Sequence, residues 1–295
     1  METVNIFWDP AGITLDQTYK KAHAGTPADG DTPYVKMSIR MLSIDTPETN
    51  YPTIGKPSNT DEELQELAEW LKNGTIKIDS GLAAHLIPKL ETGTAGTLQQ
   101  SHGEKAKIAF NHLLETRLTR PSGRKRQLFI RTADQPFDSY GRLLAYLSPS
   151  YSTQELSEIS FEDRFTFNLN MVDNGWAATL IIYPSIPKHF DLTLMREKAR
   201  DAVIGKKGVW ADELMLTGYE WRMCVKLHKQ AKRLLAGSVK YIKQEDWVAR
   251  YCLDMTTRKI YYPDRYYQVD PYNRIFAWDY DVRAAVADLN LMSGE

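Results

Sequence analysis

An alternating stretch at residues 34–44 constrains the fold of this 295-residue chain more than any other feature. Its apolar side chains recur at every second position, from Val35 to Met41, and polar side chains fill the positions between them. This two-residue period predicts a strand with one buried face and one face in water. Aspartate and glycine at residues 29–31 precede the strand and predict a tight turn.

Short strands and amphipathic helices alternate along the chain that follows. Strands joined by hairpins favour an α+β domain with a small antiparallel sheet over a doubly wound one. Residues 127–132 and 143–147 predict one such hairpin. We expect helices at residues 60–72, 104–115, 165–174, 192–205 and 213–235, and no clear element at residues 79–102. In the first helix Leu64, Leu67, Ala68 and Leu71 should be buried, and in the second Ile108, Leu113 and Leu114.

Charge, cysteine content and hydropathy exclude several classes of protein. The 37 basic and 38 acidic residues give a net charge of −1, so any affinity for nucleic acid must come from local patches. Cys224 and Cys252 cannot build a disulfide framework, and we expect free thiols. The apolar runs are far shorter than the roughly 20 residues of a transmembrane helix, so no membrane partner is expected. No secretory signal begins the sequence as written, which predicts a cytoplasmic protein, or a secreted one if a leader was removed.

An arginine and two carboxylates lie close together at the end of the first strand: Arg40, Asp45 and Glu48. Carboxylates bind hard divalent cations or deprotonate water, and a guanidinium binds phosphoryl oxygens in pairs. In a flat strand Arg40 and Asp45 would point to opposite faces, so one shared site requires the strand to end, bulge or twist before Asp45. Asp-Thr-Pro-Glu is also a good turn or helix-start sequence, and alone it favours that structural role.

A second arginine, Arg142, follows Gly141 at the start of an apolar strand, where by itself it would be a solvated hairpin residue. Together and in this order, the two elements resemble the staphylococcal nuclease (thermonuclease) family. The resemblance covers roughly residues 18–212, with insertions. It rests on residues 29–32, 39–49, the helix after residues 103–104, residues 140–146, residues 168–177 and residues 208–210.

The resemblance implies an α+β protein with an OB-fold, a five-stranded β-barrel with packed helices, over residues 1–212. An insertion near residues 50–102 and a C-terminal α+β extension at residues 213–295 complete the expected domains. The family implies calcium-dependent hydrolysis of phosphodiester bonds in DNA and RNA, single-stranded or locally open, by water, with little sequence specificity and 3′-phosphate products. Position by position, Asp31, Asp45 and Thr46 match the Ca²⁺ ligands, Thr46 through its carbonyl, while Glu48 matches the proposed general base and Arg40 and Arg142 the phosphate-binding arginines.

Tyr183 matches one tyrosine of the family's nucleotide pocket. The companion expected two residues earlier is Ile181 here, and the lysine before the Tyr-Gly-Arg sequence is Ser139. These departures concern base preference and pocket affinity, and they leave the hydrolytic residues in place.

Three segments leave alternatives open. The basic run from Arg117 to Arg131 either binds phosphates without sequence preference or is a solvated loop. Residues 50–102 form either a lid at the active-site edge or, as we favour, a packed addition. The arginines and tyrosines of residues 213–295 either stack bases or, as we favour, pack the helix at 213–235 against the barrel.

The leading interpretation is therefore a calcium-dependent nuclease. Two alternatives from other classes are a catalytically weak OB-fold module that binds nucleic acid, and an interaction protein that acts through residues 213–295. The sequence predicts neither the oligomeric state nor a preference between DNA and RNA, or between internal and terminal cleavage.

Overall fold

The computed structural model describes residues 23–24 and 35–292. The predicted turn at residues 29–32, with Asp31, lies outside the described residues. The chain divides into two compact units: unit 1 contains Met1–Arg40 and Thr132–Ala145, and unit 2 contains Met41–Arg131 and Tyr146–Glu295.

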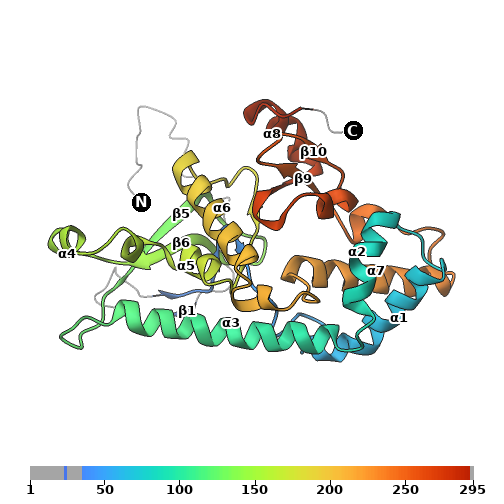
Figure 1. Cartoon of the computed structure of the whole chain (residues 1–295), viewed down its shortest axis with the longest axis horizontal. Helices are drawn as coiled ribbons and strands as arrows, with labels where there is room; N and C mark the ends of the chain where they lie inside the picture. The colour runs from blue at the N-terminus through green and yellow to red at the C-terminus, as the bar shows by residue number, and fades with distance from the viewer. Residues whose placement is uncertain (1–22, 25–34, 293–295) are drawn as a thin grey trace, which may run out of the picture. The chain divides into compact units, whose positions relative to one another are not determined.

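Helices and short strands alternate through the chain (Figure 1). The helices are α1 (Asp61–Lys72), α2 (Ser80–Leu90), α3 (Ala95–Leu118), α4 (Thr153–Glu158), α5 (Phe167–Asp173), α6 (His189–Ile204), α7 (Gly218–Leu235) and α8 (Val282–Asp288). The strands are β1 (His23–Ala24), β2 (Val35–Lys36), β3 (Ile39–Met41), β4 (Ile44–Asp45), β5 (Leu128–Phe137), β6 (Leu143–Pro149), β7 (Ala178–Thr179), β8 (Ile181–Ile182), β9 (Arg250–Asp254), β10 (Ile260–Tyr261) and β11 (Arg274–Trp278).

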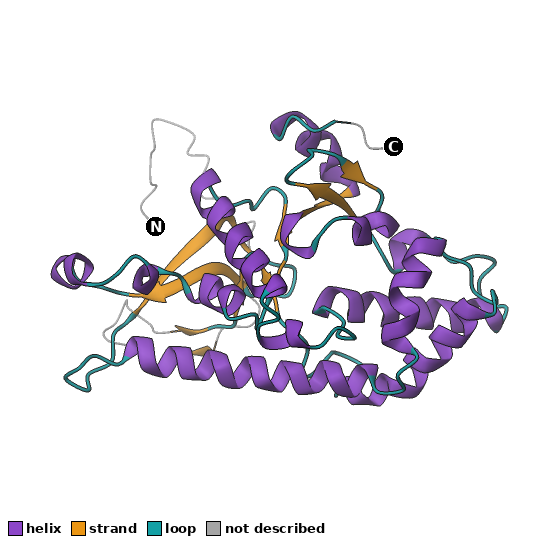
Figure 2. Ribbon diagram, viewed as in Figure 1, coloured by secondary structure: helices purple, strands orange, loops and turns teal. Residues whose placement is uncertain are grey.

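The described strands form four small sheets, with the orders β1-β2, β3-β6-β5, β4-β7 and β10-β9-β11-β8. In the last sheet β9 pairs antiparallel with β10 and β11, and β11 pairs parallel with β8. This sheet lies in unit 2, and helix α8 packs against its strand β11 (Figure 2). The mixture of helix and strand agrees with the α+β class. The predicted five-stranded barrel is not confirmed, because no sheet closes among the described residues.

The continuous strand predicted over residues 34–44 is wrong. The chain forms three short strands, β2, β3 and β4, and Ser43 between β3 and β4 has a φ of 62°. A positive φ lies outside the strand region, so the extended chain is interrupted immediately before β4. Asp45 then pairs with Ala178 across β4 and β7. Because the strand is broken at Ser43, the expectation that Arg40 and Asp45 point to opposite faces of one flat strand no longer applies.

The predicted helices are confirmed, with one error in what they bury. Helix α1 buries the four expected residues and ends before Gly74, whose φ is 75°. Helix α3 begins nine residues earlier than predicted, and Ile108 on it is 69% exposed, so its predicted burial is wrong. The buried face of α3 instead consists of small and polar residues, namely Ala95, Gly96, Gln99, His102, Gly103 and Ala106.

Two clusters of buried apolar side chains make the core of unit 2. One joins α1, α2 and α7 around the fully buried Trp221. The other joins α5 and α6 to β8, β9 and β11. In Figure 1, α1, α2 and α7 lie together, and α3 runs from this group to α5. Residues 213–295 therefore share both clusters with the residues before them, and the insertion's helices α1 and α2 are packed elements.

Two smaller predictions can be compared directly with the structure. Cys224 and Cys252 are both free and buried, as expected. No helix within the described part of the chain is long and apolar enough to cross a membrane.

Candidate functional site

Two acidic residues of the predicted site, Asp45 and Glu48, lie in unit 2, where β4 and helix α3 fix their backbone. Asp45 ends β4 and is 2% exposed. Gly103 of α3 lies against the loop that follows β4, so closely that an added Cβ would be 2.6 Å from the carbonyl oxygen of Glu48. When the buried Gln99 amide is oriented so that both its polar atoms have partners, it accepts a hydrogen bond from the Glu48 N–H and donates one to the Leu216 carbonyl, both at 2.9 Å. Helix α3 thus holds the acidic loop and ties it to the segment that leads into α7.

The carboxylates of Asp45 and Glu48 share one counter-ion, Arg222 of α7. Its Nη2 donates to Asp45 Oδ2 at 2.8 Å, and its Nη1 donates to Glu48 Oε1 at 2.5 Å. Burial lowers the pKa of Arg222, but the two carboxylates outweigh burial and raise that pKa above its ordinary value. The guanidinium therefore stays charged at physiological pH. We call Asp45, Glu48 and Arg222 the acidic centre.

Helix α7 also begins directly against these residues. An added Cβ on Gly218, its first residue, would lie 2.6 Å from the Thr46 carbonyl oxygen and 2.7 Å from Asp45 Oδ2. Thr217 and Glu220 form a capping box that fixes the helix start. The positive end of the α7 dipole is therefore a second source of positive charge beside Asp45.

The acidic centre in this conformation does not fit a calcium ion. Calcium takes roughly six to eight oxygen ligands, whereas the guanidinium of Arg222 holds an oxygen of each carboxylate, and Gly218 lies against the Thr46 carbonyl. In the described part of the chain, no group of three or more His, Cys, Asp or Glu side chains could hold a metal. The third predicted ligand, Asp31, lies outside the described residues.

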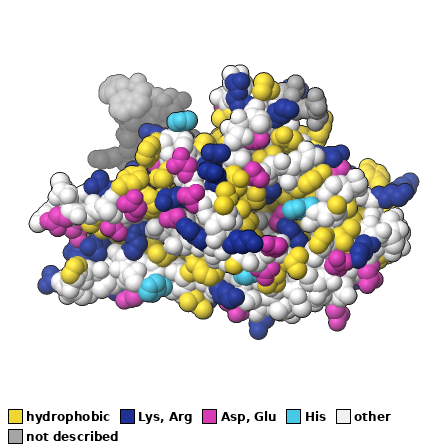
Figure 3. Space-filling model, in the orientation of Figure 1, with side chains coloured by type: hydrophobic (Ala, Val, Ile, Leu, Met, Phe, Trp, Pro, Cys, Tyr) yellow, Lys and Arg dark blue, Asp and Glu magenta, His cyan; other side chains and the backbone are white. Residues whose placement is uncertain are grey.

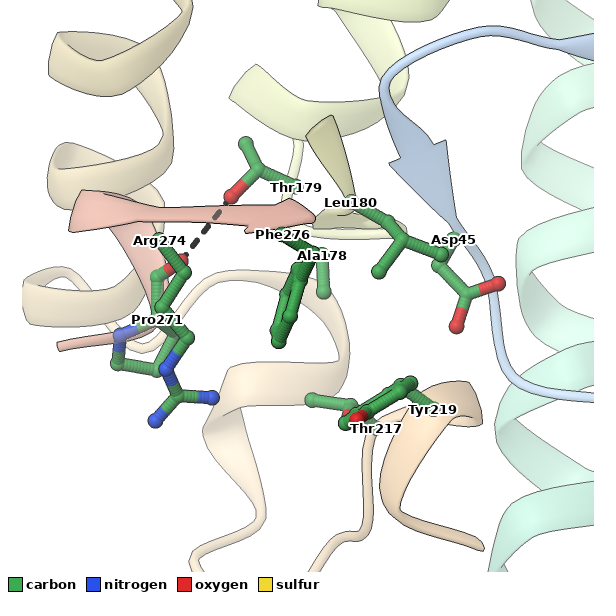
Figure 4. Close-up of a pocket in the computed structure, with 9 residues that line it drawn as sticks. All are labelled: Asp45, Ala178, Thr179, Leu180, Thr217, Tyr219, Pro271, Arg274 and Phe276. Atoms are coloured by element: carbon green, nitrogen blue, oxygen red, sulfur yellow. Dashed lines mark hydrogen bonds between the residues drawn. The ribbon is translucent and has the colours of Figure 1, made fainter. Parts of the chain in front are cut away.

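A small pocket opens beside Asp45 (Figure 4). Arg274 lies across the pocket from Asp45 in this view and is 6% exposed. Its Nε donates to the Val269 carbonyl at 2.7 Å, and its guanidinium lies 5.0 Å from the centre of the Tyr266 ring. Arg274 and Tyr266 therefore have the packing role that we favour for the arginines and tyrosines of residues 213–295. The pocket is lined by Asp45, Ala178, Thr179, Leu180, Thr217, Tyr219, Pro271, Arg274 and Phe276.

The two predicted arginines belong to unit 1. Arg40 lies on β3 and Arg142 just before β6, its neighbour in the sheet, where the Leu143 N–H donates to the Ser38 carbonyl at 3.0 Å. Asp138 orients Arg142: Nε and Nη2 each lie 2.7 Å from its Oδ2. Burial raises the pKa of Asp138, but the backbone and side chain of Arg142 outweigh it and lower that pKa. The side chain of Arg142 stays 41% exposed.

Tyr183 lies in unit 2 directly after β8 and is 8% exposed. Its hydroxyl donates to the Asp288 carboxylate at the end of α8, and this hydrogen bond raises the pKa of Tyr183. Asp288, like Arg222, belongs to residues 213–295. Residues 213–295 therefore contact three residues of the predicted site: Asp45, Glu48 and Tyr183.

The basic run is partly structural. Arg117 donates to the Phe165 carbonyl at 2.6 Å, and the Arg126 guanidinium lies 2.9 Å from a carboxylate oxygen of Glu155. The sequence could not show these contacts, because the partners are 48 and 29 positions away along the chain. Arg124 and Lys125 are exposed in the loop after α3, where Lys125 forms an ion pair with Glu115. On the face shown in Figure 3, Lys and Arg side chains are interspersed with acidic and apolar ones.

Comparison with known families gives one match. Residues 38–212 match the family model described as staphylococcal nuclease homologue, which covers more than half of the chain. No curated protein matches the sequence.

Proposed function

Because this chain belongs to the staphylococcal nuclease homologue family, we propose that it hydrolyses phosphodiester bonds of nucleic acids. Family membership supports a nuclease or nucleic-acid-binding function. One observation carries the step to hydrolysis: Arg40, Asp45, Glu48 and Arg142 match, in order, the positions to which the resemblance assigns hydrolytic roles. A binding module has no chemical need for this complete set of acids and arginines.

The proposed roles follow from the charge that develops on the attacked phosphate. Arg40 and Arg142 would bind phosphoryl oxygens and stabilise the transition state more than the ground state. Asp138 supports this role, because it fixes the direction of the Arg142 guanidinium before substrate arrives. Glu48 would accept the proton of the attacking water. Its pairing with Arg222 opposes that role, so hydrolysis requires the guanidinium to release Glu48.

The finer family properties remain predictions of this proposal. They are cleavage of both DNA and RNA, calcium dependence, little sequence specificity and 3′-phosphate ends.

A second candidate is a module that binds nucleic acid without cutting it, and the pairing of Arg222 favours it. Broken buried ion pairs leave uncompensated charge, so the acidic centre could be a permanent structural element. Nucleic acid would then be held by basic side chains alone.

The test is digestion of single-stranded DNA and of RNA by the full chain, with and without Ca²⁺, alongside binding measured by fluorescence anisotropy. The hydrolytic proposal expects fragments with 3′-phosphate ends, and none from an Arg40→Ala/Arg142→Ala double variant, which controls for contaminating nucleases. Binding without fragments would establish the second candidate in its place. Absence of both binding and cleavage would reject both.

A further inference from the structure

Arg222 is a counter-ion to both carboxylates of the acidic centre. Each of its two terminal nitrogens donates a hydrogen bond to a different carboxylate, to Asp45 at 2.8 Å and to Glu48 at 2.5 Å. Asp45 is 2% exposed and the Arg222 side chain 20% exposed, so water screens this pair far less than it screens a surface ion pair.

The backbone that carries Arg222 is rigidly placed. Its helix neighbours Trp221, Met223 and Cys224 are at most 2% exposed and belong to the core that α7 shares with α1 and α2. Gly218 lies against Thr46 and Asp45 at the start of the same helix. Withdrawal of the whole helix would expose a large apolar surface. The guanidinium can therefore leave the carboxylates by rotation of its own side chain, while α7 stays in place.

A divalent cation and this guanidinium would need the same oxygens. We propose that Arg222 is the resident cation of the acidic centre, that it competes with Ca²⁺ for Asp45 and Glu48, and that the C-terminal extension thereby controls whether the site can bind metal. This inference rests on the proposed function only in taking Asp45 and Glu48 as the acids of the site. It assigns a role to a residue beyond position 212, outside the matched family region.

The experiment measures Ca²⁺ binding to the full chain by isothermal titration calorimetry without nucleic acid. Wild type is compared with Arg222→Ala and Arg222→Gln. Removing a positive charge that lies within hydrogen-bonding distance of both carboxylates should tighten Ca²⁺ binding by at least about a hundred-fold. Arg233→Ala is the matched control, because Arg233 is exposed and lies in the last turn of the same helix. This variant should bind Ca²⁺ as wild type does.

A second mutation locates the gained site. Adding Asp45→Asn to Arg222→Gln should abolish the gain, because one of the two freed carboxylates is lost. Circular dichroism shows whether each variant is folded. If Arg222→Ala does not fold, Arg222→Gln keeps the apolar stem and a hydrogen-bonding amide without the positive charge. The rise of the Tm with added Ca²⁺ gives an independent measure of the same binding.

Two results would overturn the inference: equal Ca²⁺ affinity in wild type and both Arg222 variants, or a gain that persists in the Asp45→Asn double variant. Neither result depends on cleavage. A gained Ca²⁺ site in a chain that never cuts nucleic acid would support the inference and reject the proposed function. If wild type cleaves nucleic acid and binds Ca²⁺ as tightly as the variants do, the proposed function is supported and the inference about Arg222 is rejected.

Discussion

Arg222 and Asp45, 177 positions apart in the sequence, form an ion pair with a nitrogen-to-oxygen distance of 2.8 Å. The pair joins a helix beyond the matched family region to a carboxylate that the sequence resemblance predicts to be a metal ligand. Because both groups are largely buried, the pair affects stability and the availability of Asp45 together. The predictions below separate these two effects.

Arg40→Ala and Arg142→Ala should each lower the rate of single-stranded DNA cleavage by about a hundred- to a thousand-fold. Loss of one preorganised donor to the developing charge typically costs about 3–4 kcal/mol of transition-state stabilisation. Initial rates at saturating substrate provide the measurement, and an unchanged Tm shows that the fold is intact. Arg124→Ala, at an exposed loop tip, is the control of the same residue type. Near-normal turnover in either variant would refute the assigned role.

Charge reversal at the loop tip tests whether the basic run binds substrate. The variant Arg124→Glu/Lys125→Glu leaves the structural arginines Arg117 and Arg126 in place. Each lost phosphate contact should reduce the slope of log K against log salt by about 0.7 for single strands, while turnover at saturation is kept. Fluorescence anisotropy over a salt series measures the slope.

The control for this experiment makes the same change of charge elsewhere in unit 2. Lys229→Glu/Lys232→Glu, on the exposed face of α7, should change the slope less than the loop variant does. Identical slopes for wild type and the loop variant would mean that the loop is simply solvated.

Glu220 should make the stability of the chain depend on pH. Burial raises the pKa of Glu220, but Lys89 and the hydrogen bond to His85 outweigh it and hold that pKa well below its ordinary value of 4.5. A lowered folded-state pKa means that the stabilisation is present above about pH 4.5 and is lost as the pH falls towards the folded-state value. Glu220→Gln should therefore lower the free energy of unfolding at pH 7 by about 3–5 kcal/mol.

Urea unfolding at pH 7 and at pH 4 checks the Glu220 prediction. The difference between wild type and Glu220→Gln should shrink at the lower pH, because wild type is losing the same contribution. Glu197→Gln, an exposed change of the same kind on α6, should leave the pH dependence unaltered. A difference that is constant across the pH range would contradict the lowered pKa.

Gly218→Ala tests the close approach of α7 to the acidic loop, and the sign of the effect is decisive. Alanine is a better helix residue than glycine by about 1 kcal/mol, so helix propensity alone predicts a more stable protein. The added Cβ would instead lie 2.6 Å from the Thr46 carbonyl oxygen, and such overpacking costs about 1–3 kcal/mol. We expect a net loss of stability in chemical denaturation. A gain would mean that α7 is not seated against Thr46.

Local patterns in the sequence predicted the elements that depend on neighbouring residues. The amphipathic face of α1 follows from its apolar spacing, and its end before Gly74 follows from a glycine that tolerates the positive φ found there. The break at Ser43 did not follow, because serine gives no strong signal for a left-handed conformation. Ile108 was misassigned because helix α3 buries small residues and a glutamine where another backbone approaches closely.

The sequence by itself determined the family of this protein and its α+β class, and it supplied the candidate catalytic side chains, since these depend on residue identity and order. Only the tertiary structure showed what those side chains contact. Asp138 orients Arg142 across a turn, and Asp288 accepts a hydrogen bond from Tyr183. Arg222 forms ion pairs with the two carboxylates on which the predicted metal site depended. Position 222 is an ordinary arginine of an amphipathic helix, and it becomes a counter-ion because the packing of α7 places it beside Asp45 and Glu48. Charge pairing depends on distance in space, and an ion pair across 177 residues leaves no local pattern in the chain.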